Sequence, residues 1–148
     1  MGYKQPVSVL VVIYTATLQV LLLERADFPG YWQSVTGSRD GDETLSETAA
    51  RETFEETGLD ANLYTLIDWQ QQNVYEIYPQ WQHRYPPGTT LNIEHVFGLQ
   101  LAQQVGVNLS PREHLSYQWL PWNVAADKVF SPSNREAILE LPERLRHV

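Results

Sequence analysis

The chain has no cysteine, a single methionine and few basic residues. Without cysteine, neither disulfide bonds nor a thiolate metal site can form, and a reducing compartment is compatible with the sequence. Lysine and arginine together number 10 against 18 aspartates and glutamates, which gives a formal net charge of −8 at pH 7. Because this charge repels nucleic-acid phosphates, we expect no general binding to DNA or RNA.

The chain also lacks a hydrophobic run long enough to cross a bilayer. The apolar stretch near its start, within MGYKQPVSVLVVIY, is shorter than the ~20 residues that a spanning helix needs, and it lacks the small-residue cleavage site of a signal peptide. We therefore expect a cytoplasmic protein with no membrane partner and no obligate protein partner. A chain of 148 residues without repeats or linkers suits one domain, residues 1–148.

What is present is an acidic segment, GSRDGDETLSETAARETFEETGL, that begins at Gly37 and ends at Leu59. Thr44 followed by Glu47 forms a capping box, in which a hydroxyl and a carboxylate bond the free amides at a helix start. Gly58 supplies a left-handed stop at the other end. The segment therefore predicts one helix with a defined beginning and end.

The predicted helix places carboxylates on its packing face. At about 100° per residue, Glu52 and Glu56 project within about 40° of each other, and Glu55 lies just to one side. The expected inward arc is formed by Leu45, Ala49, Ala50, Thr53 and Phe54. Burial of neighbouring acids is costly unless a cation or a proton neutralises them.

A hard divalent cation is the natural partner of this acidic cluster. Oxygen ligands without cysteine or a histidine pair favour Mg²⁺, or Mn²⁺ in its place, over Zn²⁺. The alternative is a solvated acidic face. The helix caps and Arg51, which can hold a carboxylate through a bidentate contact, favour the metal site. Glu43 is expected to brace the preceding loop and not to bind the metal.

The same segment resembles the signature of the Nudix hydrolases, in which a glycine, a lone glutamate and an Arg-Glu-x-x-Glu-Glu-x-Gly run recur at fixed spacing. The matching positions are Gly37, Glu43, Arg51, Glu52, Glu55, Glu56, Gly58 and Leu59. Thr53 departs from it, because the family usually has a large aliphatic residue there. This departure concerns helix packing and leaves the acidic residues in place.

Hydrophobic patterning predicts an α/β fold. Strands are expected at residues 7–14, 20–24, 32–36, 63–69, 74–78, 93–101 and 117–120. A C-terminal helix is expected to begin with Ser131 as N-cap and Pro132 in the first turn, and to end by Pro142. A mixed central sheet between this helix and the acidic one would be the Nudix α/β/α sandwich.

Flanking strings resemble a narrower group, the bacterial dihydroneopterin triphosphate pyrophosphohydrolases of folate biosynthesis. They are YKQPVSVLVVIY, YWQSVTG, HRYPPG, EHLSYQWL and SNREAI. This resemblance implies hydrolysis of 7,8-dihydroneopterin 3'-triphosphate to the monophosphate and pyrophosphate. Two alternatives stay open: a Nudix house-cleaning hydrolase of nucleoside triphosphates, and a catalytically silent Nudix domain that senses a ligand.

The resemblance also implies residue roles. The metal ligands would be Glu52, Glu56, Glu113 and Glu55, and the catalytic residues Arg51, Glu52, Glu55 and Glu56. The substrate contacts would be Lys4, Arg25, Thr36, Tyr75, Glu76, Ile77, Tyr78 and Ser131. Glu113 lies in a loop, where most acids are simply solvated.

Physical chemistry agrees with several of these roles. Lys4 and Arg25 can take phosphate charge, as can His83, Arg84 and Arg135, and Ser131 lies at a helix N-terminus suited to anions. Tyr75 and Tyr78, three residues apart on the expected strand, should face opposite sides, so only one can stack on a pterin. Glu76 is an alternative acceptor for the amino-pyrimidine edge. The proton of the attacking water would pass to Glu55 or Glu56.

Overall fold

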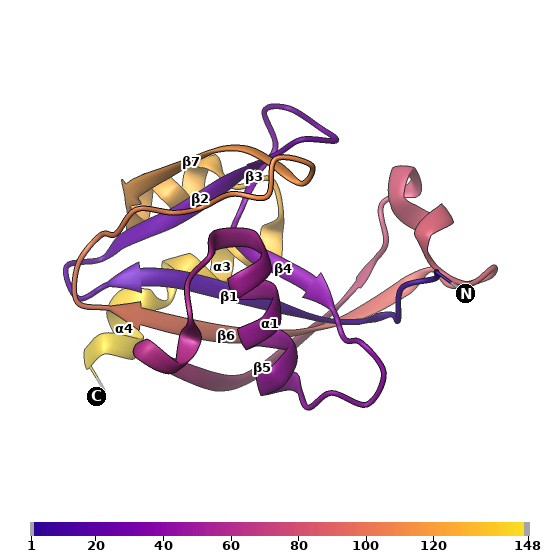
Figure 1. Ribbon diagram of the computed structural model, residues 1–148, viewed down its shortest axis with the longest axis horizontal. Helices are drawn as coiled ribbons and strands as arrows, with labels where there is room; N and C mark the ends of the chain where they lie inside the picture. The colour runs from indigo at the N-terminus through magenta and orange to yellow at the C-terminus, as the bar shows by residue number, and fades with distance from the viewer. Residues whose placement is uncertain (1, 147–148) are drawn as a thin grey trace.

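The computed structural model describes residues 2–146 and contains a mixed, strongly twisted sheet (Figure 1). Its strands are β1 (Val7–Thr15), β2 (Gln19–Arg25), β3 (Trp32–Gln33), β4 (Val35–Ser38), β5 (Thr65–Glu76), β6 (Leu91–Leu101) and β7 (His114–Pro121). Neighbouring strands follow the order β3-β2-β1-β6-β5, with β4 paired to β1 and β7 paired to β2. The β1–β6 pair is parallel and the other pairs are antiparallel.

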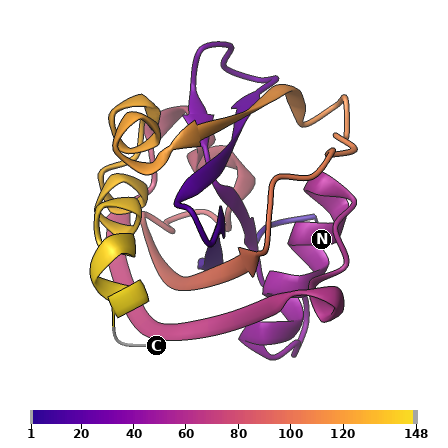
Figure 2. The same cartoon turned by 90° about the vertical axis from the view of Figure 1, so that its left-hand side faces the viewer.

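Helices cover both faces of this sheet (Figures 1 and 2). Helix α1 (Leu45–Thr57) lies on one face, and α2 (Trp122–Lys128), α3 (Pro132–Leu139) and α4 (Leu141–Arg146) lie on the other. Strand β1 is buried on both sides because its side chains alternate: Val9 and Val11 pack in the cluster of α1, and Leu10 and Val12 pack in that of α2 and α3. The predicted α/β/α sandwich with a mixed sheet is confirmed.

Two strand predictions differ from the structure. The expected strands at 63–69 and 74–78 are one strand, β5, which carries a bulge where the register with β6 shifts between Asp68 and Gln71. Gln70 has a positive φ of 55° there, and its amide donates to Asp68 Oδ1 at 2.8 Å. The polar run in the middle of β5 therefore marks a bulge and not a turn.

The expected strand at 32–36 is in turn divided into β3 and β4. Ser34, between them, donates its amide to Asn134 Oδ1 of α3 at 2.8 Å instead of to a neighbouring strand. At the C-terminus, Ser131 is the N-cap of α3 as predicted, and that helix ends before Pro142. Helices α2 and α4 and the short 3-10 helices η1 (Ala61–Leu63) and η2 (Pro79–Arg84) were not predicted.

Helix α1 keeps its predicted ends. Thr44 and Glu47 form the capping box, and Gly58 closes the helix with a φ of 75°. The prediction for Phe54 is wrong, because its side chain is exposed. The buried residues of the helix are Thr48, Ala49, Glu52, Thr53, Glu56 and Thr57. At about 100° per residue this face is centred between Glu56 and Ala49, and Phe54 lies on the opposite side.

Within residues 2–146, no helix has both the length and the apolar character needed to span a membrane.

Candidate active site

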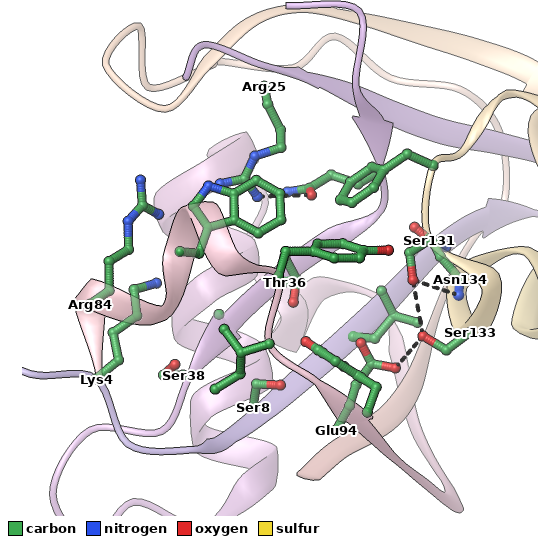
Figure 3. Close-up of a pocket in the computed structure, with 18 of the residues that line it drawn as sticks. Lys4, Ser8, Arg25, Thr36, Ser38, Arg84, Glu94, Ser131, Ser133 and Asn134 are labelled. Atoms are coloured by element: carbon green, nitrogen blue, oxygen red, sulfur yellow. Dashed lines mark hydrogen bonds between the residues drawn. The ribbon is translucent and has the colours of Figure 1, made fainter. Parts of the chain in front are cut away.

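A cavity of about 510 Å³ lies where α1, β4, β5, the η2 segment and the start of α3 meet. Helix α1, called the box helix below because it carries most of the segment that resembles the Nudix signature, contributes Glu56. Strand β4 contributes Thr36, Gly37 and Ser38. Figure 3 shows cationic side chains, Lys4, Arg25 and Arg84, on one side and Glu94, Ser131 and Ser133 on the other. The cavity is therefore polarised, with positive charge at one end and oxygen acceptors at the other.

Strand β4 holds the acidic helix closely. The backbone of Thr36 acts on Glu56 and lowers the pKa of its carboxyl, against the larger effects that raise it. A β-carbon built at Gly37 would overlap the carboxyl group of Glu52, so a larger residue would displace that group. Gly37 thus leaves the space that the Glu52 carboxylate occupies.

Glu52 and Glu56 form a buried acidic pair. They are 9% and 2% exposed, and Glu56 Oε1 is buried without a hydrogen-bond partner among residues 2–146. Burial raises the pKa of both carboxyls, and Glu52 raises the pKa of Glu56 further. A group that is costly to ionise here is stabilised by a proton or by a cation.

Arg51 organises the acids around this pair. Its Nε and Nη2 donate to the two oxygens of Glu43 at 2.7 and 3.0 Å, and Nη1 donates to Glu52 at 2.8 Å and to Glu55 at 3.2 Å. Glu43 also accepts from the Asp40 amide at 2.9 Å, so it braces the loop before α1, as predicted. Arg51 lowers the pKa of Glu43 to about 2.

Glu113 reaches the cavity from the loop before β7. It is exposed, it lines the cavity with Glu56, and its charge contributes to the raised pKa of Glu56. Its neighbour His114 is buried, with Nε2 3.8 Å from Glu56 Oε1, and burial lowers the pKa of its imidazole to about 4. In the described chain, no three histidine, aspartate or glutamate side chains already surround a common point as metal ligands do.

The cationic end is built around Asp27. Its carboxylate accepts from Arg25 at 2.7 and 2.8 Å, from Arg84 at 3.0 Å and from Trp81 Nε1 at 3.0 Å. The guanidinium of Arg25 also lies over the Trp81 ring, 4.2 Å from its centroid. Burial and the charge of Arg84 lower the pKa of Lys4. Three cations are thus held together, with a single carboxylate anchoring two of them.

Aromatic side chains form one wall of the cavity. Tyr78 packs against Trp81 and Phe130 with centroid separations of 5.4 and 5.9 Å. Tyr75 and Tyr78 both line the cavity. The prediction placed both on one strand, but β5 ends at Glu76 and Tyr78 caps helix η2, so the argument from strand alternation does not apply to this pair.

The opposite end holds a buried carboxylate. Glu94 of β6 is 4% exposed, and its Oε1 accepts from Ser133 Oγ at 2.8 Å and from Asn73 Nδ2 at 3.4 Å. Ser131 Oγ lies 3.1 Å from Ser133 Oγ. Burial raises the pKa of Glu94.

The cavity collects most of the predicted residues from distant parts of the chain. Every predicted substrate residue lines it, namely Lys4, Arg25, Thr36, Tyr75, Glu76, Ile77, Tyr78 and Ser131, as do Glu56, Glu113 and Arg84. Five predicted residues do not line it, namely Arg51, Glu52, Glu55, His83 and Arg135. Arg135 lies 3.7 Å from Asp127. Sequence reasoning missed Glu94, Asn73 and Ser133. The signal for Glu94 was the one acid in the strand LNIEHVFGLQL, in which apolar residues predominate.

A comparison with known protein families identifies the class of protein. Residues 4–141 match the model of the NUDIX domain, and the chain belongs to that family. Nudix hydrolases generally use divalent metal ions.

Two sequence relatives and one solved structure show which Nudix proteins this chain is similar to. The chain is 47% identical over 139 residues to the dihydroneopterin triphosphate diphosphatase of Escherichia coli (strain K12), covering 92% of this chain and 91% of that protein. It is 41% identical to the Haemophilus influenzae protein of the same name, covering 99% and 93%. The solved structure of the E. coli dihydroneopterin triphosphate pyrophosphohydrolase matches with a TM-score of 0.89 and 45% identity, covering 95% of this chain and 97% of that one.

Proposed function

We propose that this chain hydrolyses 7,8-dihydroneopterin 3'-triphosphate to dihydroneopterin monophosphate and pyrophosphate. The observation that carries the proposal is the polarised cavity, in a chain whose relatives of that name align over nearly its whole length. The cationic end suits a triphosphate, and the wall of Tyr78, Trp81 and Phe130 suits a flat heterocycle.

The acidic pair fits a divalent cation. Glu56 Oε1 has no hydrogen-bond partner in the described chain, and the pKa of both buried carboxyls is raised in the absence of a cation. Hard oxygen donors favour Mg²⁺, with Mn²⁺ able to replace it. Glu52 and Glu56 would hold the ion, with Glu113 and Glu55 completing its ligands. When bound, Mg²⁺ would neutralise phosphate charge and lower the pKa of a bound water.

Side chains of the protein would bind the substrate, accept the proton and position the acidic residues. Lys4, Arg25 and Arg84 would bind phosphate oxygens and hold the triphosphate along the cavity towards Glu56. The proton of the attacking water would pass to a carboxylate oxygen of Glu55 or Glu56. Arg51 would keep Glu52 and Glu55 in place through the contacts described above. Ser131 and Thr36 offer hydroxyl groups at the cavity wall.

A comparison of substrates tests the proposal. Polar groups aimed at the pterin are left unpaired by another base, at a cost of about 1–3 kcal/mol for each group. We expect kcat/KM for dihydroneopterin triphosphate to exceed that for ATP, GTP and dATP by at least about tenfold, which is what one such group supplies. Equal or faster turnover of any of these nucleotides would refute this substrate and favour a house-cleaning hydrolase. Inorganic tripolyphosphate should be a poor substrate, because it lacks the heterocycle that positions the chain of phosphates.

A further inference from the structure

Glu94 stands out among the carboxylates that line the cavity because it lies on the side opposite Lys4 and Arg84 (Figure 3). It comes from β6, at the register position of Ser8 on β1 and of Asn73 on β5. At 4% exposed it is nearly enclosed by protein. Acids in this position need a partner, since burial without one raises the free energy of the charged form.

Only half of the Glu94 carboxylate has such partners. Both hydrogen bonds, from Ser133 Oγ at 2.8 Å and from Asn73 Nδ2 at 3.4 Å, end on Oε1. Within residues 2–146, Oε2 accepts no hydrogen bond, and it is not one of the side-chain oxygens sealed inside the protein without a partner. Since Glu94 lines the cavity, a ligand there can reach this oxygen.

Hydrogen bonds hold α3, the helix whose Ser133 donates to Glu94. Asn134 accepts from the Ser34 amide at 2.8 Å and donates to Ser34 Oγ at 3.0 Å, which fixes the first turn of α3 to the strand region. Because the Ser133 proton goes to Glu94, the hydrogen bond between Ser131 and Ser133 is donated by Ser131. The hydroxyl groups of Ser131 and Ser133 thus orient the Glu94 carboxylate through Oε1 and leave Oε2 free for a ligand.

We propose that Glu94 is the specificity-determining acceptor for a heterocycle that presents a ring N–H beside an exocyclic amino group, as the 2-amino-4-oxopyrimidine edge of a pterin does. The free Oε2 offers two acceptor sites, and this pair of neighbouring N–H groups can donate to both. Adenine and cytosine lack the pair, and guanine has it. The assignment rests on the proposed function for the choice of pterin over guanine, and it replaces Glu76 as the acceptor, because Glu76 is exposed at the end of β5.

The test compares matched ligands on matched variants. Dissociation constants are measured for 7,8-dihydroneopterin and for its lumazine counterpart, in which a carbonyl replaces the 2-amino group. In parallel, kcat/KM is measured for dihydroneopterin triphosphate, GTP, ITP and ATP, of which ITP lacks only the 2-amino group of GTP. The proteins are the wild type, Glu94→Gln and Glu140→Gln, the last being an exposed acid directly after α3 that loses the same charge and does not line the cavity.

We expect the wild type to bind dihydroneopterin at least about tenfold more tightly than the lumazine, and to prefer GTP to ITP by a similar factor. In Glu94→Gln both preferences should fall towards one, with ATP and ITP turnover changed less than about threefold. Glu140→Gln should keep both preferences. Unchanged preferences in Glu94→Gln, or an equal loss for all four triphosphates, would overturn the assignment.

The two proposals fail separately. If the wild type hydrolyses ATP as well as dihydroneopterin triphosphate, the proposed substrate is wrong, whereas loss of the GTP-over-ITP preference in Glu94→Gln would still support the acceptor. If the wild type prefers dihydroneopterin triphosphate and Glu94→Gln keeps that preference, the substrate stands and the acceptor does not.

Discussion

Replacement of Glu56 by glutamine tests the metal site through stability as well as activity. Glu56 is 2% exposed, its Oε1 has no partner in the described chain, and burial together with Glu52 raises its pKa above the usual 4.5. A carboxyl whose pKa is raised by folding stabilises the protein below the unfolded-state pKa, and this stability is lost as pH rises through the folded-state pKa. Metal-free wild type should therefore melt at a lower temperature at about pH 8 than at about pH 5.

Glutamine keeps the shape of Glu56 and removes its charge. Relief of a buried unpaired group is worth about 1–3 kcal/mol, and each kcal/mol shifts the melting temperature of a chain of 148 residues by about 2–4 °C. Metal-free Glu56→Gln should thus melt about 2–12 °C above the wild type at about pH 8, with a smaller difference at about pH 5. Differential scanning calorimetry in the presence of a chelator measures both.

Addition of Mg²⁺ should narrow or reverse this difference in melting temperature. At 100 times its dissociation constant, a ligand that binds only the folded state stabilises the wild type by about 2.7 kcal/mol, or about 5–11 °C here. Glu56→Gln should gain much less and should lose turnover by about 10² or more. Asp42→Asn, an exposed acid of the preceding loop, provides the control and should match the wild type. Near-normal activity of Glu56→Gln with an unchanged response to Mg²⁺ would refute the metal assignment.

Other substitutions probe separate parts of the account. Glu113→Ala should raise the Mg²⁺ concentration needed for half-maximal activity and lower turnover, and an unchanged Mg²⁺ titration would make Glu113 a solvated charge. Arg84→Ala should raise KM for the triphosphate several-fold because a charged hydrogen-bond donor is lost, and steady-state kinetics with an unaltered KM would remove Arg84 from the phosphate site. Thr53→Val should raise the melting temperature by about 2–4 °C for each kcal/mol recovered, since the Thr53 hydroxyl is buried without a partner in residues 2–146. A lower melting temperature would show that this hydroxyl is satisfied.

Local chemistry in the sequence was sufficient to predict the box helix. The capping box at Thr44, the stop at Gly58 and the burial of Glu52 and Glu56 depend on contacts within one turn or one face of a helix, and all are present. The predicted inward arc extended too far towards Phe54, because the buried face is centred between Glu56 and Ala49. The helix instead buries small residues and carboxylates, and its acids occupy the place of a larger apolar face.

Long-range pairing was not predictable in the same way. Glu94, Asn73 and Ser133 come from β6, β5 and α3, and only the register of the sheet and the docking of α3 place them together. The bulge at Gln70 likewise depends on pairing with β6. The arginines at Asp27 meet because the η2 segment folds over the loop after β2, which no local pattern indicated.

Product analysis in ¹⁸O-labelled water tests the central claim most directly. Purified protein, Mg²⁺ and dihydroneopterin triphosphate are incubated together in ¹⁸O-labelled water. The products are then separated, and mass spectrometry identifies them and their labelled oxygen atoms. The account predicts equal amounts of dihydroneopterin monophosphate and pyrophosphate, with one labelled oxygen in one of the two, which also identifies the phosphorus that is attacked. Release of orthophosphate with dihydroneopterin diphosphate, or no hydrolysis at all, would contradict it.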